Sequence, residues 1–275
     1  MTLFLTGGTG FIGSHFLRAA LVAGHRVVAL RRSGARPCLP LAAEPQWLDG
    51  ALDTVPADAL RGCDALVHFA ALGVSPQKAS WAELFRVNVG ASVALWQAAA
   101  EAGVRSFLVC GSCFEYGQSA GRYAAIPPAA PLEPANGYGA SKAAASVAAL
   151  ALARERGLRL SVLRPFHVFG EGQHEGNFWP SLRAAALAGQ DFPMTAGEQV
   201  RDFVPVEQVA ARFLAELAAP PPPGEPRVAN VGTGQAQTLR AFAEEWWGHF
   251  GATGRLLPGA VPYRANEVMR YVPQI

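Results

Sequence analysis

Thr6-Gly7-Gly8-Thr9-Gly10-Phe11-Ile12-Gly13 connects an apolar strand, predicted over residues 2–6, to a helix predicted over residues 11–23. Glycine permits positive φ and close backbone approach, and a helix N-terminus offers unpaired N–H groups to an anion. In this context the segment predicts a turn that holds the pyrophosphate of a dinucleotide, and the alternative is an ordinary glycine-rich turn. The residues assigned to the cofactor here are Gly7, Thr9, Gly10, Phe11, Ile12 and Gly13.

Short apolar runs then alternate with helical patterns, which is typical of parallel βαβ units. Further strands are predicted at 26–30, 46–48, 65–69, 106–110, 159–163 and 227–231, and long helices at 81–102 and 138–156. We therefore expect an α/β fold, a doubly wound Rossmann-type parallel sheet with a small C-terminal substrate-binding subdomain. Residues 1–165 form the predicted dinucleotide-binding domain. Residues 166–275 form the substrate-binding region, interleaved with late Rossmann elements at about 201–250.

The composition excludes several classes of protein. In 275 residues, 23 Lys and Arg face 21 Asp and Glu, and this near-balance argues against a nucleic-acid binder. A hydrophobic content of 51% excludes a disordered chain. No signal peptide or membrane-spanning run is visible, so we expect a cytoplasmic protein. Four cysteines lack metal-ligand spacing and indicate a reduced compartment with no metal site: Cys38, Cys63, Cys110 and Cys113.

The second predicted strand ends in Leu30-Arg31-Arg32-Ser33, where an NAD-preferring site would carry an acid for the ribose 2′-hydroxyl. Guanidinium groups match a 2′-phosphate instead. Arg31 and Arg32 therefore favour NADP(H), with NAD(H) as the other option, and the alternative is that both arginines are only solvated.

Tyr138-Gly-Ala-Ser-Lys142 opens an alanine-rich helix and places Tyr138 and Lys142 one turn apart on one face. A phenol with a pKa near 10 is a poor base at neutral pH, and a neighbouring ammonium stabilises its phenolate. Tyr138 could then exchange a proton with a substrate hydroxyl. The pair alone is weak evidence, since exposed Tyr and Lys often share a helix face, but it becomes strong beside the glycine turn.

With these motifs the chain resembles the extended short-chain dehydrogenases/reductases, specifically the NAD(P)-dependent epimerase/dehydratase group that acts on nucleotide sugars. The resemblance covers most of the chain and rests on residues 6–13, Asp64-Ala-Leu-Val-His-Phe-Ala-Ala71, Asn88, Cys110-Gly-Ser-Cys-Phe-Glu-Tyr-Gly117, 138–142, Arg164-Pro-Phe-His-Val-Phe-Gly170 and Arg201-Asp-Phe-Val-Pro205.

The resemblance implies reversible hydride transfer between the nicotinamide and a sugar carbon. Tyr138 would move the proton, Lys142 would hold the ribose, and Ser112 would hydrogen-bond the same sugar oxygen. Asn88 would support the cofactor side, although a structural Asn is an equal alternative, and Asp49 would contact the adenine. The remaining cofactor positions implied by the resemblance are Phe69, Ala70, Ala71, Pro165 and His167.

For the sugar nucleotide, Asn177 and Arg201 match family positions that contact the diphosphate, and Arg264 is a candidate second cation. The alternatives are a helix-capping Asn and solvated arginines. His167 stands where many relatives carry an Asn beside the sugar, so it could contact the sugar or act as an acid, or simply pack at a strand end. Cys113 and Phe114 adjoin the sugar, and His174 is a weaker candidate.

Positions at which this sequence differs from the family pattern favour some of the family's reactions over others. The family's dehydratases carry an Asp-Glu pair where this chain has Cys113 and Phe114, so 4,6-dehydration is disfavoured, and Glu115 is expected to point to the other face. NADP(H) preference favours reduction of a nucleotide-linked 4-keto sugar, such as a 6-deoxyhexose. The alternatives are an NAD-dependent nucleotide-sugar 4-epimerase, reduction of a non-nucleotide ketone or aldehyde, and a non-catalytic dinucleotide sensor.

The resemblance also implies a homodimer formed through the two long helices, for which Val89, Val93 and Trp96 supply an apolar stripe. The alternative is that this stripe faces the core. The chain ends earlier than most relatives, which predicts a more open pocket or one covered by the partner subunit.

Overall fold

Seven parallel strands form the central sheet of the computed structural model, which describes residues 1–74, 76–264 and 267–275. Their spatial order is β11-β6-β5-β4-β1-β2-β3, and the order reverses between β1 and β4. This is the arrangement of a Rossmann fold and confirms the predicted fold class. The strands are β1 Thr2–Thr6, β2 Arg26–Arg31, β3 Gln46–Asp49, β4 Ala65–His68, β5 Ser106–Cys110, β6 Arg159–Pro165 and β11 Arg227–Val231.

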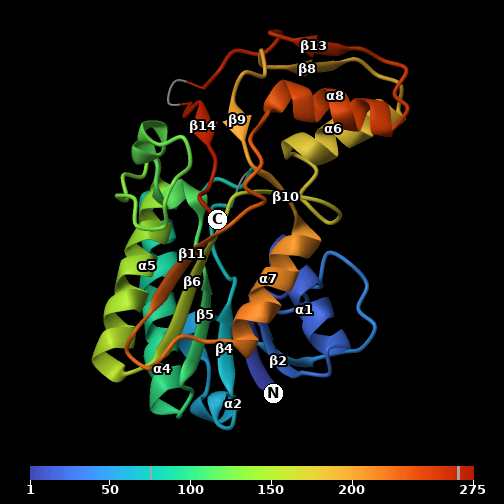
Figure 1. Cartoon of the computed structure of the whole chain (residues 1–275). Helices are drawn as coiled ribbons and strands as arrows, with labels where there is room; N and C mark the ends of the chain where they lie inside the picture. The colour runs from blue at the N-terminus through green and yellow to red at the C-terminus, as the bar shows by residue number, and fades with distance from the viewer. Residues whose placement is uncertain (75, 265–266) are drawn as a thin grey trace.

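Helices cover both faces of the sheet (Figure 1). On one face lie α1, Phe11–Val22, and α7, Val206–Ala218, which bury Phe16 and Phe213 in one core cluster. On the other lie α4, Ser92–Glu101, and α5, Gly137–Arg156, which bury a second cluster around Leu95. Because both faces are covered, the inner strands are apolar on both sides, and every residue of β4 is buried.

The helix predicted over residues 81–102 is divided into three segments. α3, Trp81–Phe85, leads into a π-helical segment, Arg86–Ala91, and then into α4. The Ser92 hydroxyl donates to the Val87 carbonyl at 3.2 Å, a backbone contact of the kind that accompanies irregular helix geometry. The π-helical turn also aims Asn88 inward, which a hydrophobic pattern does not reveal.

The apolar stripe proposed for dimerisation faces the protein interior instead. Trp96 is 1% exposed, and Val89 and Val93 pack against the same core cluster. The large apolar side chains that these helices expose are Trp81 and Phe85 of α3 and Val147 of α5. Of the two alternatives for the stripe, the core-facing one is therefore confirmed, because α4 presents this face to the sheet.

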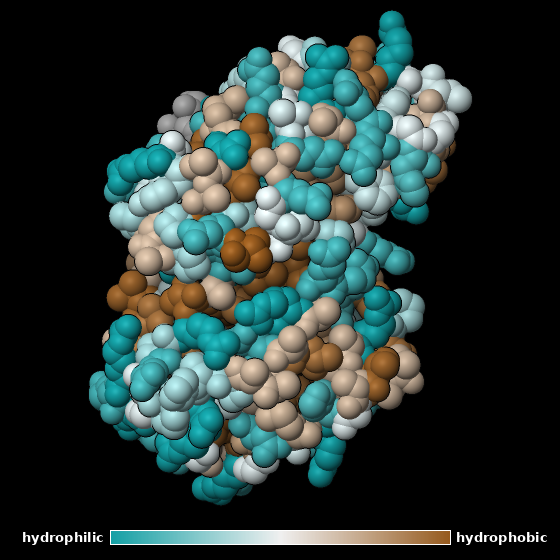
Figure 2. Space-filling view, viewed as in Figure 1, coloured by the Kyte–Doolittle hydropathy of each residue, from teal (hydrophilic) through white to brown (hydrophobic). Residues whose placement is uncertain are grey.

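A smaller upper lobe is built from α6, Phe178–Leu187, and α8, Leu239–His249, around a third core cluster (Figure 1). Its strands β8, Phe192–Met194, and β13, Leu256–Pro258, pair in parallel. The chain returns to the central sheet through α7 and β11, so residues 166–275 contribute to both parts. In the space-filling view, hydrophobic residues gather at mid-height, between the upper lobe and the sheet (Figure 2).

Three short pairings lie between the two parts. β7, His167–Phe169, pairs in parallel with β10, Phe203–Pro205. β9, Val200–Arg201, lies between β12, Gln237–Thr238, and β14, Arg270–Tyr271. The remaining short helices are η1 Leu52–Thr54, α2 Ala57–Leu60, η3 Cys113–Glu115 and η4 Gln118–Arg122.

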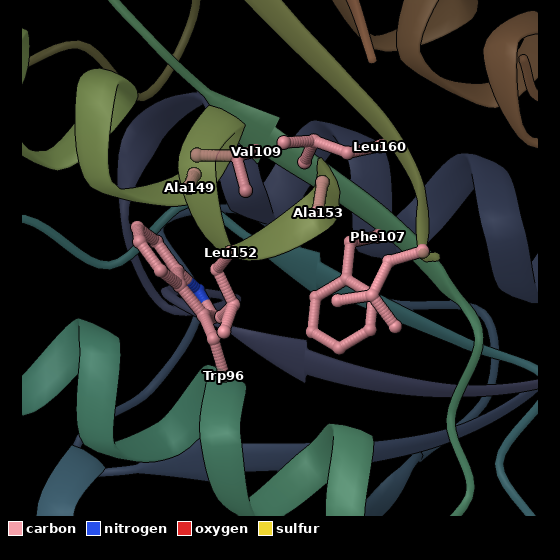
Figure 3. Close-up of a pocket in the computed structure, with 8 residues that line it drawn as sticks. Trp96, Phe107, Val109, Ala149, Leu152, Ala153 and Leu160 are labelled. Atoms are coloured by element: carbon pink, nitrogen blue, oxygen red, sulfur yellow. The ribbon is translucent and has the colours of Figure 1, made fainter. Parts of the chain in front are cut away.

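A small apolar cavity remains between α4, α5 and the sheet (Figure 3). Its volume is about 10 Å³, and its lining includes Trp96, Phe107 and Leu160. The Trp96 indole N–H has no hydrogen-bond partner among the described residues. The cavity is a packing defect of the core, because a space of this size holds at most one water molecule. Within the described part of the chain, no helix is long and apolar enough to cross a bilayer.

Candidate active site

The carboxyl ends of the parallel strands bring the predicted site residues to one edge of the sheet. Arg31 ends β2, Asp49 ends β3, Cys110 ends β5 and Pro165 ends β6. Ligands of open α/β sheets bind at this edge, beside the point where the strand order reverses. The glycine turn follows β1 at that point.

The glycine turn is closely packed, and the geometry at Gly7 and Gly13 leaves no space for a side chain. Gly7 has a φ of +73°, and a Cβ there would lie 2.5 Å from the Ala70 nitrogen. A Cβ on Gly13 would lie 2.1 Å from the Gly7 carbonyl oxygen. Gly10 is exposed at the N-terminus of the 12-residue α1, beside Phe11, Ile12 and Thr9. Open N–H groups and a glycine surface fit a dinucleotide pyrophosphate.

Behind the turn lies a buried polar chain that the sequence interpretation did not include. The ring of His68 bonds the Thr6 hydroxyl through Nδ1 at 2.8 Å and the Ser92 hydroxyl through Nε2 at 3.1 Å. Burial, and after it the charge of Lys142, lowers the pKa of His68 to about 3. His68 is therefore a neutral cross-link between β1, β4 and α4.

Arg31 and Asp49, which were predicted to hold different parts of the cofactor, contact each other. Arg31 Nε donates to Asp49 Oδ1 at 2.7 Å, and the guanidinium lies over the Trp47 ring at 4.7 Å. Arg31 is therefore held in place rather than freely solvated. Arg32 is exposed beside it.

Phe69, Ala70 and Ala71 follow β4, and the backbone of Phe69 and Ala70 lies against the glycine turn. The Phe69 ring packs on Phe16 and Phe213, with centroids 5.2 and 4.7 Å away, so it supports the segment from the core.

Asn88 holds the next residue of this segment. Its Oδ1 accepts from the Leu72 N–H at 2.7 Å, and its Nδ2 donates to the Leu72 carbonyl and the Ser141 hydroxyl. Asn88 thus ties the segment after β4 to α5, next to Lys142.

Ser112, Tyr138 and Lys142 meet because α5 lies directly against the turn after β5. The Asn136 side chain caps α5 by accepting from the Gly139 N–H at 2.8 Å. A Cβ on Gly139 would lie 2.5 Å from the Phe114 carbonyl oxygen, so glycine permits this close approach. Lys142 is buried and donates through Nζ to the Cys110 carbonyl at 2.6 Å. The Ser112 hydroxyl oxygen accepts from the Phe114 N–H at 3.2 Å, which leaves its own proton available for donation.

The pKa of the Tyr138 hydroxyl is raised above its ordinary value of 10, chiefly by burial, while a hydrogen bond with Ser112 opposes the shift. In this environment Tyr138 keeps its proton at neutral pH and is suited to donate it.

Aromatic rings form a wall beside Tyr138. The Phe114 ring lies edge-on to those of Tyr138 and His167, with centroids 6.3 and 6.0 Å away, and it also contacts Tyr271. Cys113 is buried behind the wall, and burial raises the pKa of its thiol to about 12, so the thiol is neutral. Tyr271, which the sequence interpretation missed, comes from β14 and is buried against the rings of Phe114 and His167.

His167 is uncharged at neutral pH. Burial, and then the charge of Arg201, lowers its pKa to about 3, which favours the uncharged imidazole. Its Nδ1 is buried and has no partner among the described residues. A neutral imidazole can still donate or accept one hydrogen bond, so a sugar contact remains compatible with the structure.

The candidate diphosphate residues differ in exposure. Arg201 is buried, not solvated, and pairs with Glu267 at 2.6 Å. Asn177 occupies the N-cap of α6 without a side-chain capping bond, so the capping alternative does not account for it. Arg264 is exposed, and its carbonyl accepts from the Glu267 N–H at 3.1 Å. His174 is exposed and accepts from the Gly176 N–H.

Comparison with known proteins identifies the family of the chain. The model of the NAD dependent epimerase/dehydratase family matches residues 3–232. The GDP-6-deoxy-D-mannose reductase of Pseudomonas aeruginosa is 33% identical over 258 residues, covering 88% of this chain and 78% of the relative. The UDP-glucose 4-epimerase of Corynebacterium glutamicum is 28% identical over 290 residues, covering 97% and 85%.

Among solved structures, MoeE5 in complex with UDP-glucuronic acid and NAD aligns with a TM-score of 0.86 at 31% identity. The alignment covers 100% of this chain and 90% of MoeE5. The family match spans the glycine turn, Ser112, Tyr138 and Lys142. The chain therefore belongs to the NAD-dependent epimerase/dehydratase family and is an enzyme of its nucleotide-sugar epimerases, dehydratases and reductases.

Proposed function

We propose that this enzyme uses NADP(H) to reduce the 4-keto group of a nucleotide-linked sugar, with a 6-deoxyhexose as the preferred class. The observation that carries the proposal is the surroundings of Tyr138. Its hydroxyl holds its proton, and the wall beside it is formed by Phe114 and neutral Cys113 and His167. The nearby Glu115 is completely buried and paired with Arg164, so it is not available as an acid for elimination.

The glycine turn, Arg31 and Lys142 would hold the dinucleotide, and its reduced nicotinamide would supply the hydride for the carbonyl carbon. Tyr138 transfers its hydroxyl proton to the carbonyl oxygen, and the Ser112 hydroxyl donates a hydrogen bond to the same oxygen as negative charge develops. Lys142, held by the Cys110 carbonyl, retains further N–H donors for the ribose.

Arg31 and Arg32 support the choice of NADP(H), because guanidinium groups stand where an acid would select NAD. Asp49 holds Arg31 through Nε and so orients the guanidinium at the end of β2. The same pairing neutralises part of the charge of Arg31. The contribution of Arg31 to NADPH binding is therefore tested by mutation of Arg31 itself.

Substrate recognition is assigned to Asn177, Arg201 and Arg264 for the diphosphate, and to His167 and the aromatic wall for the sugar. An apolar wall beside the reacting carbon is compatible with a methyl group better than with a hydroxyl, which would lose its water there. The relative from P. aeruginosa, a reductase of a 6-deoxy sugar by its name, supports this class.

A nucleotide-sugar 4-epimerase that uses NAD is the second candidate. The relative from C. glutamicum favours it, and the same Ser112, Tyr138 and Lys142 would serve it.

The test is an assay of NADPH and NADH oxidation with nucleotide-linked 4-keto-6-deoxy sugars, together with an assay of UDP-glucose epimerisation. We expect reduction with NADPH and a loss of about 10²-fold or more in kcat for Tyr138→Phe, with NADPH binding retained. Epimerisation without net cofactor turnover would replace the proposal with the second candidate. Unchanged turnover in Tyr138→Phe would contradict both enzymatic mechanisms.

A further inference from the structure

We propose that Glu115 is a positioning residue that, through its buried pair with Arg164, fixes Ser112 for its contact with the substrate oxygen. The proposal rests on the function proposed above for Ser112 and assigns a role to a carboxylate that the reaction itself does not use. Glu115 is 0% exposed, so its charge must be satisfied inside the protein.

The two carboxylate oxygens of Glu115 have separate tasks. Oε1 accepts from the backbone N–H of Ser112 at 2.8 Å. Oε2 accepts from Arg164 Nε, also at 2.8 Å. The side chain therefore connects the first residue of the catalytic turn to a cation anchored on β6. Charge-assisted hydrogen bonds of this kind are the strong ones in a protein interior.

Arg164 is itself held on several sides. Its Nη1 donates to the Tyr116 hydroxyl and to the Pro128 carbonyl, each at 3.0 Å. The Tyr116 hydroxyl donates to Asn230 Oδ1 at 2.7 Å, which ties the network to β11. Burial lowers the pKa of Arg164, but Glu115 and Tyr116 more than offset this effect and raise it overall, so the guanidinium stays charged. The carboxylate thus has a rigid partner.

Gly111 provides the space for the pair. A Cβ at this position would lie 2.6 Å from Glu115 Oε1 and 2.9 Å from Arg164 Cγ. The residue immediately before Ser112 must therefore be glycine as long as the pair is present. This requirement is independent of the hydrogen bonds and points to the same arrangement.

Two hydrogen bonds fix Ser112, one at its hydroxyl and one at its backbone N–H. Its hydroxyl oxygen accepts from the Phe114 N–H, and its backbone N–H is held by Glu115. With its oxygen accepting from Phe114 and its backbone N–H bound to Glu115, the Ser112 hydroxyl keeps its proton for donation on the substrate side of the turn. A displacement of about 1 Å of such a group can cost about 10²-fold in rate.

The experiment compares Glu115→Gln and Gly111→Ala with the wild-type enzyme. Glu115→Gln keeps the size of the side chain and removes its charge, whereas Gly111→Ala pushes the carboxylate aside and leaves both charges in place. Glu216→Gln is the matched control, because Glu216 is also a buried acid, paired with Arg212 and Arg227 away from Ser112. The readouts are the hydrogen-exchange rate of the Ser112 amide, kcat, KM and Tm.

We expect faster exchange of the Ser112 amide in both variants, and a kcat lower by roughly tenfold to a hundredfold with KM and NADPH binding within about twofold. Glu216→Gln should lower Tm and leave kcat and the Ser112 amide unchanged. If Ser112 exchange and kcat match the wild type in both variants, the proposal is wrong and Glu115 is structural only. Absence of sugar reduction in the wild type would refute the proposed function, while the exchange measurement would still test Glu115.

Discussion

Arg31 is the main residue that favours NADP(H) over NAD(H). Its guanidinium pairs with Asp49, which therefore competes with a 2′-phosphate for the same positive charge. The pair joins the ends of β2 and β3 at 2.7 Å, with Asp49 about half exposed to solvent. Two functions can be separated by mutation here: selection of the 2′-phosphate by the guanidinium, and orientation of the guanidinium by the carboxylate.

Arg31→Ala is expected to weaken NADPH binding by roughly tenfold, about 1.4 kcal/mol, and to leave NADH binding nearly unchanged. Asp49→Asn removes the carboxylate that orients the guanidinium, so it should weaken NADPH binding in the same direction but by a smaller factor. Fluorescence titration with each dinucleotide measures both effects. An equal loss of NADPH and NADH binding in Arg31→Ala would contradict a role in 2′-phosphate selection.

The turn between β1 and α1 depends on backbone contacts that admit no side chain. Gly13→Ala would place a methyl group 2.1 Å from the Gly7 carbonyl and force the turn open. We expect loss of dinucleotide binding in this variant, measured by titration with NADPH. Gly248→Ala is the control, since that glycine lies in α8 with no atom within 4 Å of the added Cβ. Retained NADPH affinity in Gly13→Ala would show that the turn is not the binding element.

The π-helical segment before α4 supports the cofactor side of the site through the side chain of Asn88. Asn88→Ala removes the bonds to Leu72 and Ser141 and leaves the Leu72 N–H without its acceptor. The expected cost is about 1 to 3 kcal/mol in the free energy of unfolding, measured with urea, together with weaker NADPH binding. Gln97→Ala, on the exposed side of α4, should change stability by less than about 0.5 kcal/mol. Equal effects of the two substitutions would argue against a stabilising role for the hydrogen bonds of Asn88.

For the whole molecule, the buried histidines predict sensitivity to acid. The pKa values of His68 and His167 are lowered to about 3 from an ordinary 6.5, so the unfolded chain binds more protons between these values. Their contribution to stability is complete above pH 6.5 and is lost as pH falls toward 3. At pH 4.5 the loss is about 2 to 3 kcal/mol for the fully buried His68 and smaller for the partly exposed His167.

The measurement is the free energy of unfolding in urea at pH 7 and pH 4.5. His68→Gln should reduce the difference between the two pH values, because the variant has no proton to bind there. His174→Gln, at an exposed position, should leave the difference unchanged. Identical pH dependence of His68→Gln and the wild type would show that His68 is not protonated on unfolding.

The subunit arrangement stays a prediction. Trp81 and Phe85 stack on α3 with their centroids 6.0 Å apart, and both are exposed, as is Val147 of α5. A homodimer through these helices would cover them, whereas the stripe with Trp96 is already buried. Light scattering of the purified protein measures the mass directly, and a monomer would contradict the family-based expectation.

Local patterns were sufficient for the strands, the glycine turn and the one-turn spacing of Tyr138 and Lys142. Each predicted strand of the central sheet starts at the residue where the structure starts it, because alternation of apolar runs and turns is a property of neighbouring residues. The carboxyl edge of the sheet also follows from the parallel order, so most candidate residues were expected on one side. Catalytic roles for these residues remain the proposals made above.

The side-chain partners had to come from the folded chain. Glu115 meets Arg164 across 49 residues, Arg31 meets Asp49 across 18, and Arg201 meets Glu267 across 66. Within the π-helical segment at residues 86–91, Asn88 reaches Leu72 and Ser141. Neither spacing nor composition specifies these contacts, because they depend on how the strands and helices cross. The same crossings set the burial that keeps Tyr138 protonated and His167 uncharged.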